Sequence, residues 1–139
     1  MKTPWHLWLV GVASLAWNGL GAWQWWMKTT GSQGYWGALT QAQADYMRAA
    51  PLWTDVAFGL TIWCGVLGAL LLLLRRRLAF NAYAASLIAI LADSTYVHFL
   101  SNGREVMGTE GVMFGVVLIV LCAGQTLYAR WAGRRGWLR

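Results

Sequence analysis

Four long apolar segments, separated by short polar ones, dominate the chain. They cover residues 5–27, 53–74, 82–100 and 111–129. An α-helix needs about 20 mostly apolar residues to cross a bilayer core of about 30 Å. The apolar residues form continuous runs instead of alternating with polar ones, which excludes a transmembrane β-barrel. The pattern therefore predicts an all-α integral membrane protein, an antiparallel four-helix transmembrane bundle that forms one domain over residues 1–139.

The segments between the spans differ in length and character. The longest covers residues 28–52, and its first part, residues 29–34, is turn-like. Residues 40–48 are good helix formers and are followed by Pro51, which ends a helix. We expect a short amphipathic helix there, lying on the outer surface and capping the bundle. Residues 75–81 are expected to form a tight inner turn, and residues 101–110 a short outer loop.

The composition agrees with a membrane protein. Hydrophobic residues make up 58% of the chain and charged residues 12%, whereas soluble domains average about 45–50% and about 25%. A chain with so much apolar surface is neither a soluble globule nor a disordered segment. The first apolar segment could also be a secretory signal cleaved after Ala16, but it continues beyond that position, so we expect a retained span.

The positive charges predict the orientation. With four spans, eight Lys and Arg residues fall on the side of the termini and three on the other side, where Asp45, Asp55, Glu105 and Glu110 also lie. Positive residues concentrate in cytoplasmic loops, so both termini are expected in the cytoplasm. The net charge of +6 then reflects topology and contact with anionic membrane lipid. No basic face or recognised module accompanies it, so no nucleic-acid partner is expected.

Motifs for catalysis or for metal binding are missing from the sequence. It contains no CxxC, zinc-ligand spacing, P-loop, HExxH or dinucleotide fingerprint. Cys64 and Cys122 both lie inside apolar runs. We therefore expect no enzyme activity, no metal and no cofactor.

The tryptophans group by expected depth. Nine of the eleven fall near a membrane boundary, where indole rings form aromatic belts. Trp17 and Trp63 are central instead. Either their N–H groups bond to a neighbouring helix, or the two rings, with Trp23, form the wall of a cavity that opens outward. Such a cavity would include Asn18, Gln24, Asp55 and Asp93 and would suit a sugar or a flat lipophile.

Asp93 is the only acid well inside a predicted span. It lies eleven residues beyond Ala82, or about 17 Å along a helix, which places it near the depth of Asn18. A charge at this depth is costly and marks a functional candidate. Three interpretations stay open: a hydrogen bond to Asn18, a proton- or cation-linked binding site, or exposure to water if the helix starts later. Tyr96 lies on the face of Asp93, whereas His98 is expected to point elsewhere.

Small residues recur at helical spacing in three spans. They are Gly11, Ser14, Asn18 and Gly21 in the first, Thr61, Gly65 and Gly68 in the second, and Gly111 and Gly115 in the fourth. Small residues let helix backbones approach closely. They predict packing inside the bundle, or a dimer contact through Gly111 and Gly115.

Several short motifs give a resemblance to a family. They include residues 4–11, residues 15–22, Ala44-Asp45-Tyr46, Pro51-Leu52-Trp53, residues 63–68 and Leu100-Ser101-Asn102-Gly103. The chain resembles, over its whole length, an uncharacterised bacterial inner-membrane family with four spans that is often labelled "sugar transporter". Where that family has Gly-Ala-x-Asp-Tyr, this chain has Gln24 in place of the acid. The resemblance implies an inner-membrane location and a sugar-like solute.

Two functions are compatible with these features. The first is a small-solute binding protein or transporter, with a pocket lined by Asp93, Asn18, Tyr96, Trp17, Trp63 and Gln24. Because four spans make a small transporter, this interpretation expects a homo-oligomer. The alternative is a non-catalytic accessory or scaffold subunit of a larger membrane complex. It expects a sealed bundle without a cavity.

Overall fold

The structure is a computed structural model that describes residues 3–139, and in this part of the chain every regular element is helical. Residues 3–139 form six α-helices and one π-helical segment. They are α1 (Trp5–Thr29), α2 (Gln33–Trp36), α3 (Gln41–Ala49), α4 (Leu52–Leu73), α5 (Leu78–Thr95), η1 (Tyr96–Leu100) and α6 (Gly103–Arg134). The all-helical prediction is confirmed.

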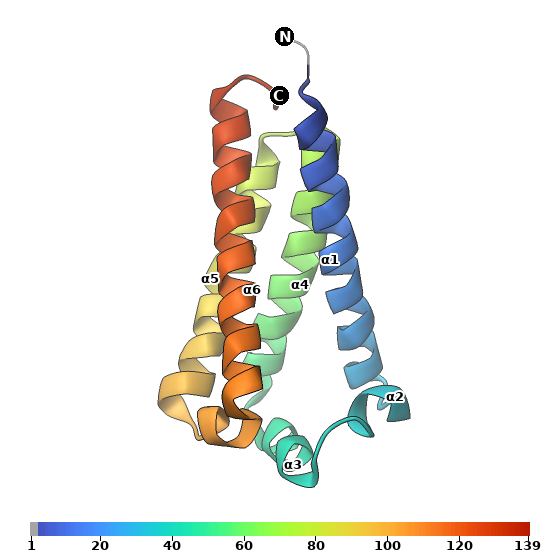
Figure 1. Cartoon of the computed structure of the whole chain (residues 1–139), viewed down its shortest axis with the longest axis vertical. Helices are drawn as coiled ribbons and strands as arrows, with labels where there is room; N and C mark the ends of the chain where they lie inside the picture. Colours follow the sequence, from blue (N-terminus) through green and yellow to red (C-terminus); the bar gives the residue numbers. More distant parts are fainter. Residues whose placement is uncertain (1–2) are drawn as a thin grey trace.

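The four longest helices lie side by side, and the chain reverses direction from each to the next (Figure 1). Helix α4 packs against α1 and α5, and α5 packs against α6. The start of α1 and the C-terminal segment lie at the same end of this assembly, which we call the terminal end (Figure 1). Helices α2 and α3 lie at the opposite end, which we call the loop end. The expected short helix, now α3, is therefore placed across one end of the long helices.

Three helical segments are long and apolar enough to cross a membrane: Leu52–Leu73, Leu78–Leu100 and Gly103–Arg134. The folded helices therefore agree with the composition in indicating a membrane protein. Helix α1 is not among the three, although it has 25 residues. It carries six of the eleven tryptophans and Asn18, and these residues lower its hydropathy without making it a charged helix.

Two helices start earlier than the pattern predicts. Helix α5 begins at Leu78 instead of residue 82. In the turn before it, the Arg77 N–H donates to the Arg139 carbonyl, and the Arg139 N–H donates to the Arg75 carbonyl. Helix α6 begins at Gly103 instead of residue 111, so most of the expected outer loop is helical. It is interrupted at Gly108, whose φ of 73° is easily adopted only by glycine.

Helix α3 matches its prediction closely. Thr40 and Gln43 form a reciprocal capping box at its start, with Gln43 N–H donating to Thr40 Oγ1 over 3.1 Å. This arrangement satisfies backbone donors that the first helical turn would otherwise leave free. The single turn of α2 was not predicted, because residues 29–34 read as a plain turn.

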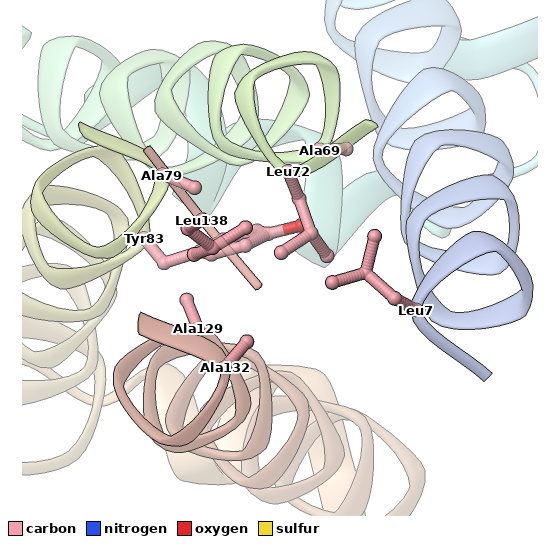
Figure 2. Close-up of a cluster of buried hydrophobic side chains, with 8 residues drawn as sticks. All are labelled: Leu7, Ala69, Leu72, Ala79, Tyr83, Ala129, Ala132 and Leu138. Carbon is pink, nitrogen blue, oxygen red and sulfur yellow. The ribbon is translucent and has the colours of Figure 1, made fainter. Parts of the chain in front are cut away.

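The terminal end holds the most tightly packed core. Leu7, Leu72 and Tyr83 are almost fully buried there, and alanines of α4, α5 and α6 fill the space between them (Figure 2). The C-terminal segment folds back so that Leu138 joins this cluster. Arg75 Nε donates to the carbonyl of Trp137 over 3.0 Å and holds the segment in place. Between membrane helices, close packing of such side chains stabilises the contact through van der Waals attraction.

Small residues allow α1 and α4 to approach closely. Gly11, Ser14 and Asn18 on α1, and Thr61, Gly65 and Gly68 on α4, are all buried, so their predicted interior packing is confirmed. Ser14 Oγ lies 2.8 Å from Tyr83 Oη, and Asn18 Nδ2 donates to the Ser14 carbonyl over 2.8 Å. A side chain at Gly65 would collide with the Asn18 amide. This layer is therefore closed by direct contacts between three helices.

Candidate functional site

A cavity of about 220 Å³ lies at the loop end, between α4, α5 and α6 and beneath α3. Its wall is mainly apolar and aromatic and contains a few polar side chains. The aromatic residues are Tyr35, Tyr46, Phe58, Tyr96 and Phe114, and the ionisable ones besides tyrosine are Lys28, Asp55, Asp93 and His98. Mostly apolar hollows with few polar groups are typical of small-molecule sites.

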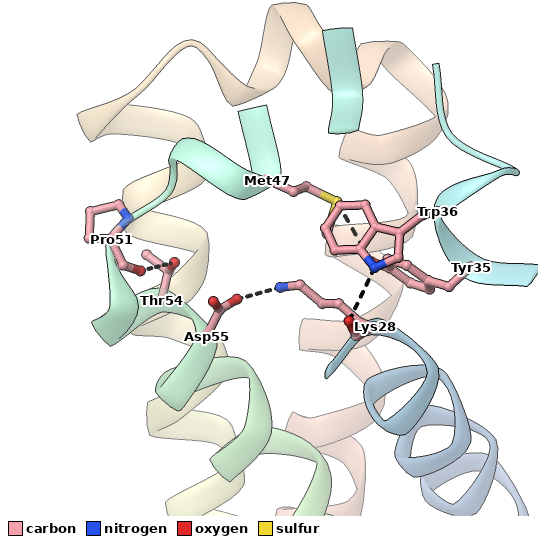
Figure 3. A network of polar contacts seen from close by, with 7 residues as sticks. All are labelled: Lys28, Tyr35, Trp36, Met47, Pro51, Thr54 and Asp55. Atoms are coloured by element: carbon pink, nitrogen blue, oxygen red, sulfur yellow. Dashed lines mark hydrogen bonds and ion pairs between the residues drawn. The ribbon is translucent and has the colours of Figure 1, made fainter. Parts of the chain in front are cut away.

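One edge of the cavity is formed by an ion pair between Lys28 and Asp55, the one ion pair among residues 3–139 (Figure 3). Lys28 lies in the last turn of α1 and Asp55 in the first turn of α4. Each charge is favoured there, because a helix dipole is negative at its C-terminal end and positive at its N-terminal end. The pair connects the two helices at the loop end.

Asp93 reaches the cavity from α5. Its side chain is half-buried, and no side chain within residues 3–139 donates a hydrogen bond to it. It lies close enough to Lys28 and Asp55 to interact with their charges. Asp93 is therefore a carboxyl group on an apolar wall with no direct partner among residues 3–139.

A π-helical segment follows Asp93 and changes the direction of the next side chains. Tyr96–Leu100 has the wider i to i+5 hydrogen-bond pattern, and Ser101 Oγ donates to the Tyr96 carbonyl over 2.8 Å. Such segments occur often at functional sites. Both Tyr96 and His98 consequently line the cavity. The expectation that His98 points elsewhere was based on regular α-helical spacing and is wrong.

Helix α3 is held over the cavity by aromatic contacts. Tyr46 Oη lies 2.6 Å from Ser101 Oγ, and its ring stacks on Tyr96 with 6.3 Å between centroids. Because Ser101 already donates to Tyr96, Tyr46 is the donor to Ser101. Burial raises the pKa of Tyr46, so its hydroxyl keeps its proton and continues to donate.

Helices α2 and α3 together form a cover over the cavity, and α2 is held on the side of α1. Trp36 Nε1 donates to the carbonyl of Lys28 over 3.1 Å (Figure 3). Arg48 of α3 lies 4.6 Å from the Trp36 ring centroid. Tyr35 Oη donates to Met47 Sδ over 3.6 Å. Burial, and then the charge of Asp55, raise the pKa of Tyr35 to about 12. The cover therefore contains two tyrosines that stay neutral at physiological pH.

A second, more open hollow of about 650 Å³ lies on the other side of the ion pair, between α1 and α4. It shares Lys28, Asp55 and Met47 with the cavity and is lined by Trp25 and Trp63. Their rings meet edge to face with 5.9 Å between centroids. Trp63 thus lies in this hollow, on the far side of the ion pair from Asp93.

The structure does not bring Asn18 to Asp93. Asn18 is bonded within the Ser14 and Tyr83 layer, and Tyr83 precedes Asp93 by ten residues, or about 15 Å of helix. The predicted common depth was counted from residue 82. Because α5 starts at Leu78, Asp93 is displaced toward the loop end.

Trp17 and Gln24 do not line the cavity either. Gln24 is exposed, and Trp17 is half-buried but is part of neither hollow. On the face of α1 that packs on α4, residues recur at whole helical turns from the buried Asn18. The residue that reaches α4 is therefore Trp25, seven positions after Asn18. Trp23, expected in the same wall, is 60% exposed.

Gly111 and Gly115 lie on the cavity wall. A Cβ added at Gly115 would lie 3.9 Å from His98 Nε2, and no other atom lies within 4 Å of it. This placement supports an interior role for the two glycines over a dimer contact. The open space at Gly115 also offers a position at which the cavity can be filled.

Sequence reasoning missed several cavity residues, Lys28, Tyr46 and His98 among them. The sequence did contain a signal for Lys28. A positive residue, Lys28, lies near the end of the first long helix, and a negative residue, Asp55, lies near the start of the next. Nothing in the residue pattern indicated the π-helical turn that brings in His98. No protein-family model, curated protein or solved structure matches the chain.

Proposed function

We propose that the protein is a four-span protein of the bacterial inner membrane, with both termini in the cytoplasm. The fourth span would be α1, whose 25 residues extend over about 37 Å. Trp5, Leu9, Val12 and Leu20 on its outward face are all more than half exposed, which suits contact with lipid. Eight of the eleven Lys and Arg residues belong to the sequence segments of the terminal end, as the positive-inside rule requires for a cytoplasmic face.

Within this topology we propose that the protein binds a small solute in the cavity at the loop end and mediates its transport. The observation that carries the proposal is a cavity of about 220 Å³ that reaches Asp93, a carboxyl group with no hydrogen-bond donor from residues 3–139. An ionisable group at membrane depth is energetically costly, so its presence there marks a functional candidate. Asp93 would bind the solute, and Tyr46 and Tyr96 would contact it from α3 and η1.

The accessory-subunit alternative expects a different interior. It predicts a bundle filled by side chains, with Asp93 satisfied by Asn18. The separation of these two residues and the open space beside Asp93 favour solute binding. A homo-oligomer remains part of the proposal, since four spans form a small transporter.

The test is a comparison of two leucine substitutions on α6. Gly115→Leu places a side chain in the cavity, where open space surrounds the glycine. Gly124→Leu adds the same side chain at an exposed position with no atom within 4 Å. Equilibrium dialysis of the full chain in lipid nanodiscs would measure binding of three probes: methyl β-glucoside, 2-phenylethanol and phenethylammonium.

We expect saturable binding of at least one probe by the wild type and by Gly124→Leu. Gly115→Leu should weaken that binding at least tenfold, because its side chain occupies the same space. Equal binding by both variants would place the solute elsewhere on the protein. Binding of none of the three probes to the wild type would contradict the proposal.

A further inference from the structure

The charges on the cavity wall do not balance. Lys28 is the one Lys or Arg among its lining residues, and it faces two carboxyl groups, Asp55 and Asp93. His98, which also lines the cavity, is counted as neutral here, as it is in the net charge of the whole chain. With both carboxyl groups ionised, the cavity has a net charge of −1, although the whole chain has a net charge of +6.

The protein already binds one ammonium group in this cavity. Lys28 Nζ is paired with Asp55 and lies 6.0 Å from the centroid of the Phe58 ring. A carboxylate on one side and an aromatic ring on the other is a favourable environment for a cation. The surroundings of Lys28 therefore show, within the same wall, how an ammonium group is accommodated.

Asp93 has a similar environment, but no cation from residues 3–139 is paired with it. The stacked rings of Tyr46 and Tyr96 lie on the same wall, and Phe114 of α6 contributes another aromatic face. No Lys or Arg of residues 3–139 forms an ion pair with Asp93. An ammonium group next to Asp93 would complete a second pair of carboxylate and aromatic groups.

We propose that the solute is a small organic cation, a protonated amine with a compact apolar body. Its ammonium group pairs with Asp93, and its body packs against Tyr96, Tyr46 and Phe114. This inference rests on the proposed function, because it assigns a chemical class to the solute of the same cavity. A sugar fits less well, since its many hydroxyls would lose hydrogen bonds to water against a mostly apolar wall.

The experiment compares two probes that differ in charge. Phenethylammonium and 2-phenylethanol share the same apolar body, and methyl β-glucoside represents sugars. Binding of each is measured by equilibrium dialysis at pH 7 with the full chain in nanodiscs. The variants are Asp93→Asn, which removes the charge, Asp93→Glu, which keeps it, and Asp45→Asn, a matched control on the exposed face of α3.

We expect the wild type to bind phenethylammonium at least tenfold more tightly than 2-phenylethanol. Asp93→Asn should abolish this preference, while Asp93→Glu and Asp45→Asn should retain it. Retention in Asp93→Glu also shows that the loss in Asp93→Asn reflects charge and not misfolding.

Two results would overturn the inference, and they separate it from the proposed function. If 2-phenylethanol or the glucoside binds as tightly as the cation, and Gly115→Leu weakens that binding, the cavity binds solutes but does not select amines. If no probe binds to the wild type, both the inference and the proposed function fail.

Discussion

At the terminal end, Leu72 and Tyr83 are 0% and 1% exposed, and the C-terminal segment covers the space between the helices. At the loop end, the same α4 and α5 border a cavity whose wall includes Phe114, which is 55% exposed. Small residues explain the first arrangement, because Gly65 and Gly68 let neighbouring helices meet. At the loop end, charged and aromatic side chains line the cavity, and Asp93 faces the Lys28–Asp55 ion pair across open space.

This contrast suggests a division of roles along one set of helices. The terminal end supplies most of the packing that holds the helices together, and the loop end can therefore keep a cavity at little cost in stability. Binding sites are often less densely packed than the scaffold that supports them. Substitutions at the terminal end and at the loop end test whether the two ends differ in stability in this way.

The largest effect is expected for Leu72→Ala at the terminal end. Removing a fully buried leucine leaves a hole in the core and should lower the free energy of unfolding by about 2–5 kcal/mol. Phe114→Ala, on the cavity wall, should cost clearly less, because its ring is already half exposed. Titration with a denaturing detergent in bicelles would measure both, and equal losses would contradict the division.

A smaller effect is expected when a methyl group is added to each end. The added Cβ of Gly68→Ala would lie 2.8 Å from the Tyr83 ring, and overpacking of this kind costs about 1–3 kcal/mol. The Cβ of Gly115→Ala would lie 3.9 Å from His98, so this variant should be neutral or gain up to about 1 kcal/mol from helix propensity. The same titration measures both, and a costly Gly115→Ala would mean that the cavity wall is closely packed.

A local effect is expected for Thr40→Ala. Loss of the capping box at α3 should destabilise that helix by about 0.5–2 kcal/mol. Amide hydrogen exchange should accelerate over Gln41–Ala49 while α5 at the terminal end stays protected. Acceleration across the whole chain would show that the cover is not an independent part of the loop end.

The smallest effect is expected for the ion pair. Asp55 is 42% exposed, so a double-mutant cycle of Lys28→Met and Asp55→Asn should give a coupling free energy of only about 0.2–1 kcal/mol. A coupling as large as the loss in Leu72→Ala would mean that the pair, and not the terminal core, holds α1 to α4.

Much of the scaffold could be predicted from the sequence. Buried small residues at helical spacing identified the faces of α1 and α4, because spacing alone determines which residues share a helix face. The α3 helix was predicted from its helix-forming residues and from Pro51. These features depend on local sequence, which the residue pattern records directly.

The candidate site was harder to predict, because it depends on where helices start and how they turn. Asp93 and Tyr96 were expected on one face, and both line the cavity. Asn18 was expected beside Asp93, but α5 begins at Leu78, four residues before the predicted start at residue 82. This shift separates the two side chains along the helices. The π-helical turn that adds His98 has no recognisable residue pattern.

We propose that the loop end faces the outside of the cell, so labelling of α5 from that side tests most directly whether the cavity is confined to the loop end. Ser86 and Asp93 lie seven residues apart on one face of α5, but Ser86 is buried in the packed layer, with its hydroxyl 2.5 Å from the Thr61 carbonyl. Ser86→Cys and Asp93→Cys, each in a background with Cys64 and Cys122 replaced by alanine, would be treated in cells with a small cationic methanethiosulfonate reagent. We predict rapid labelling of Asp93→Cys and none of Ser86→Cys. Equal labelling of the two positions, or no labelling of Asp93→Cys, would contradict a cavity confined to the loop end.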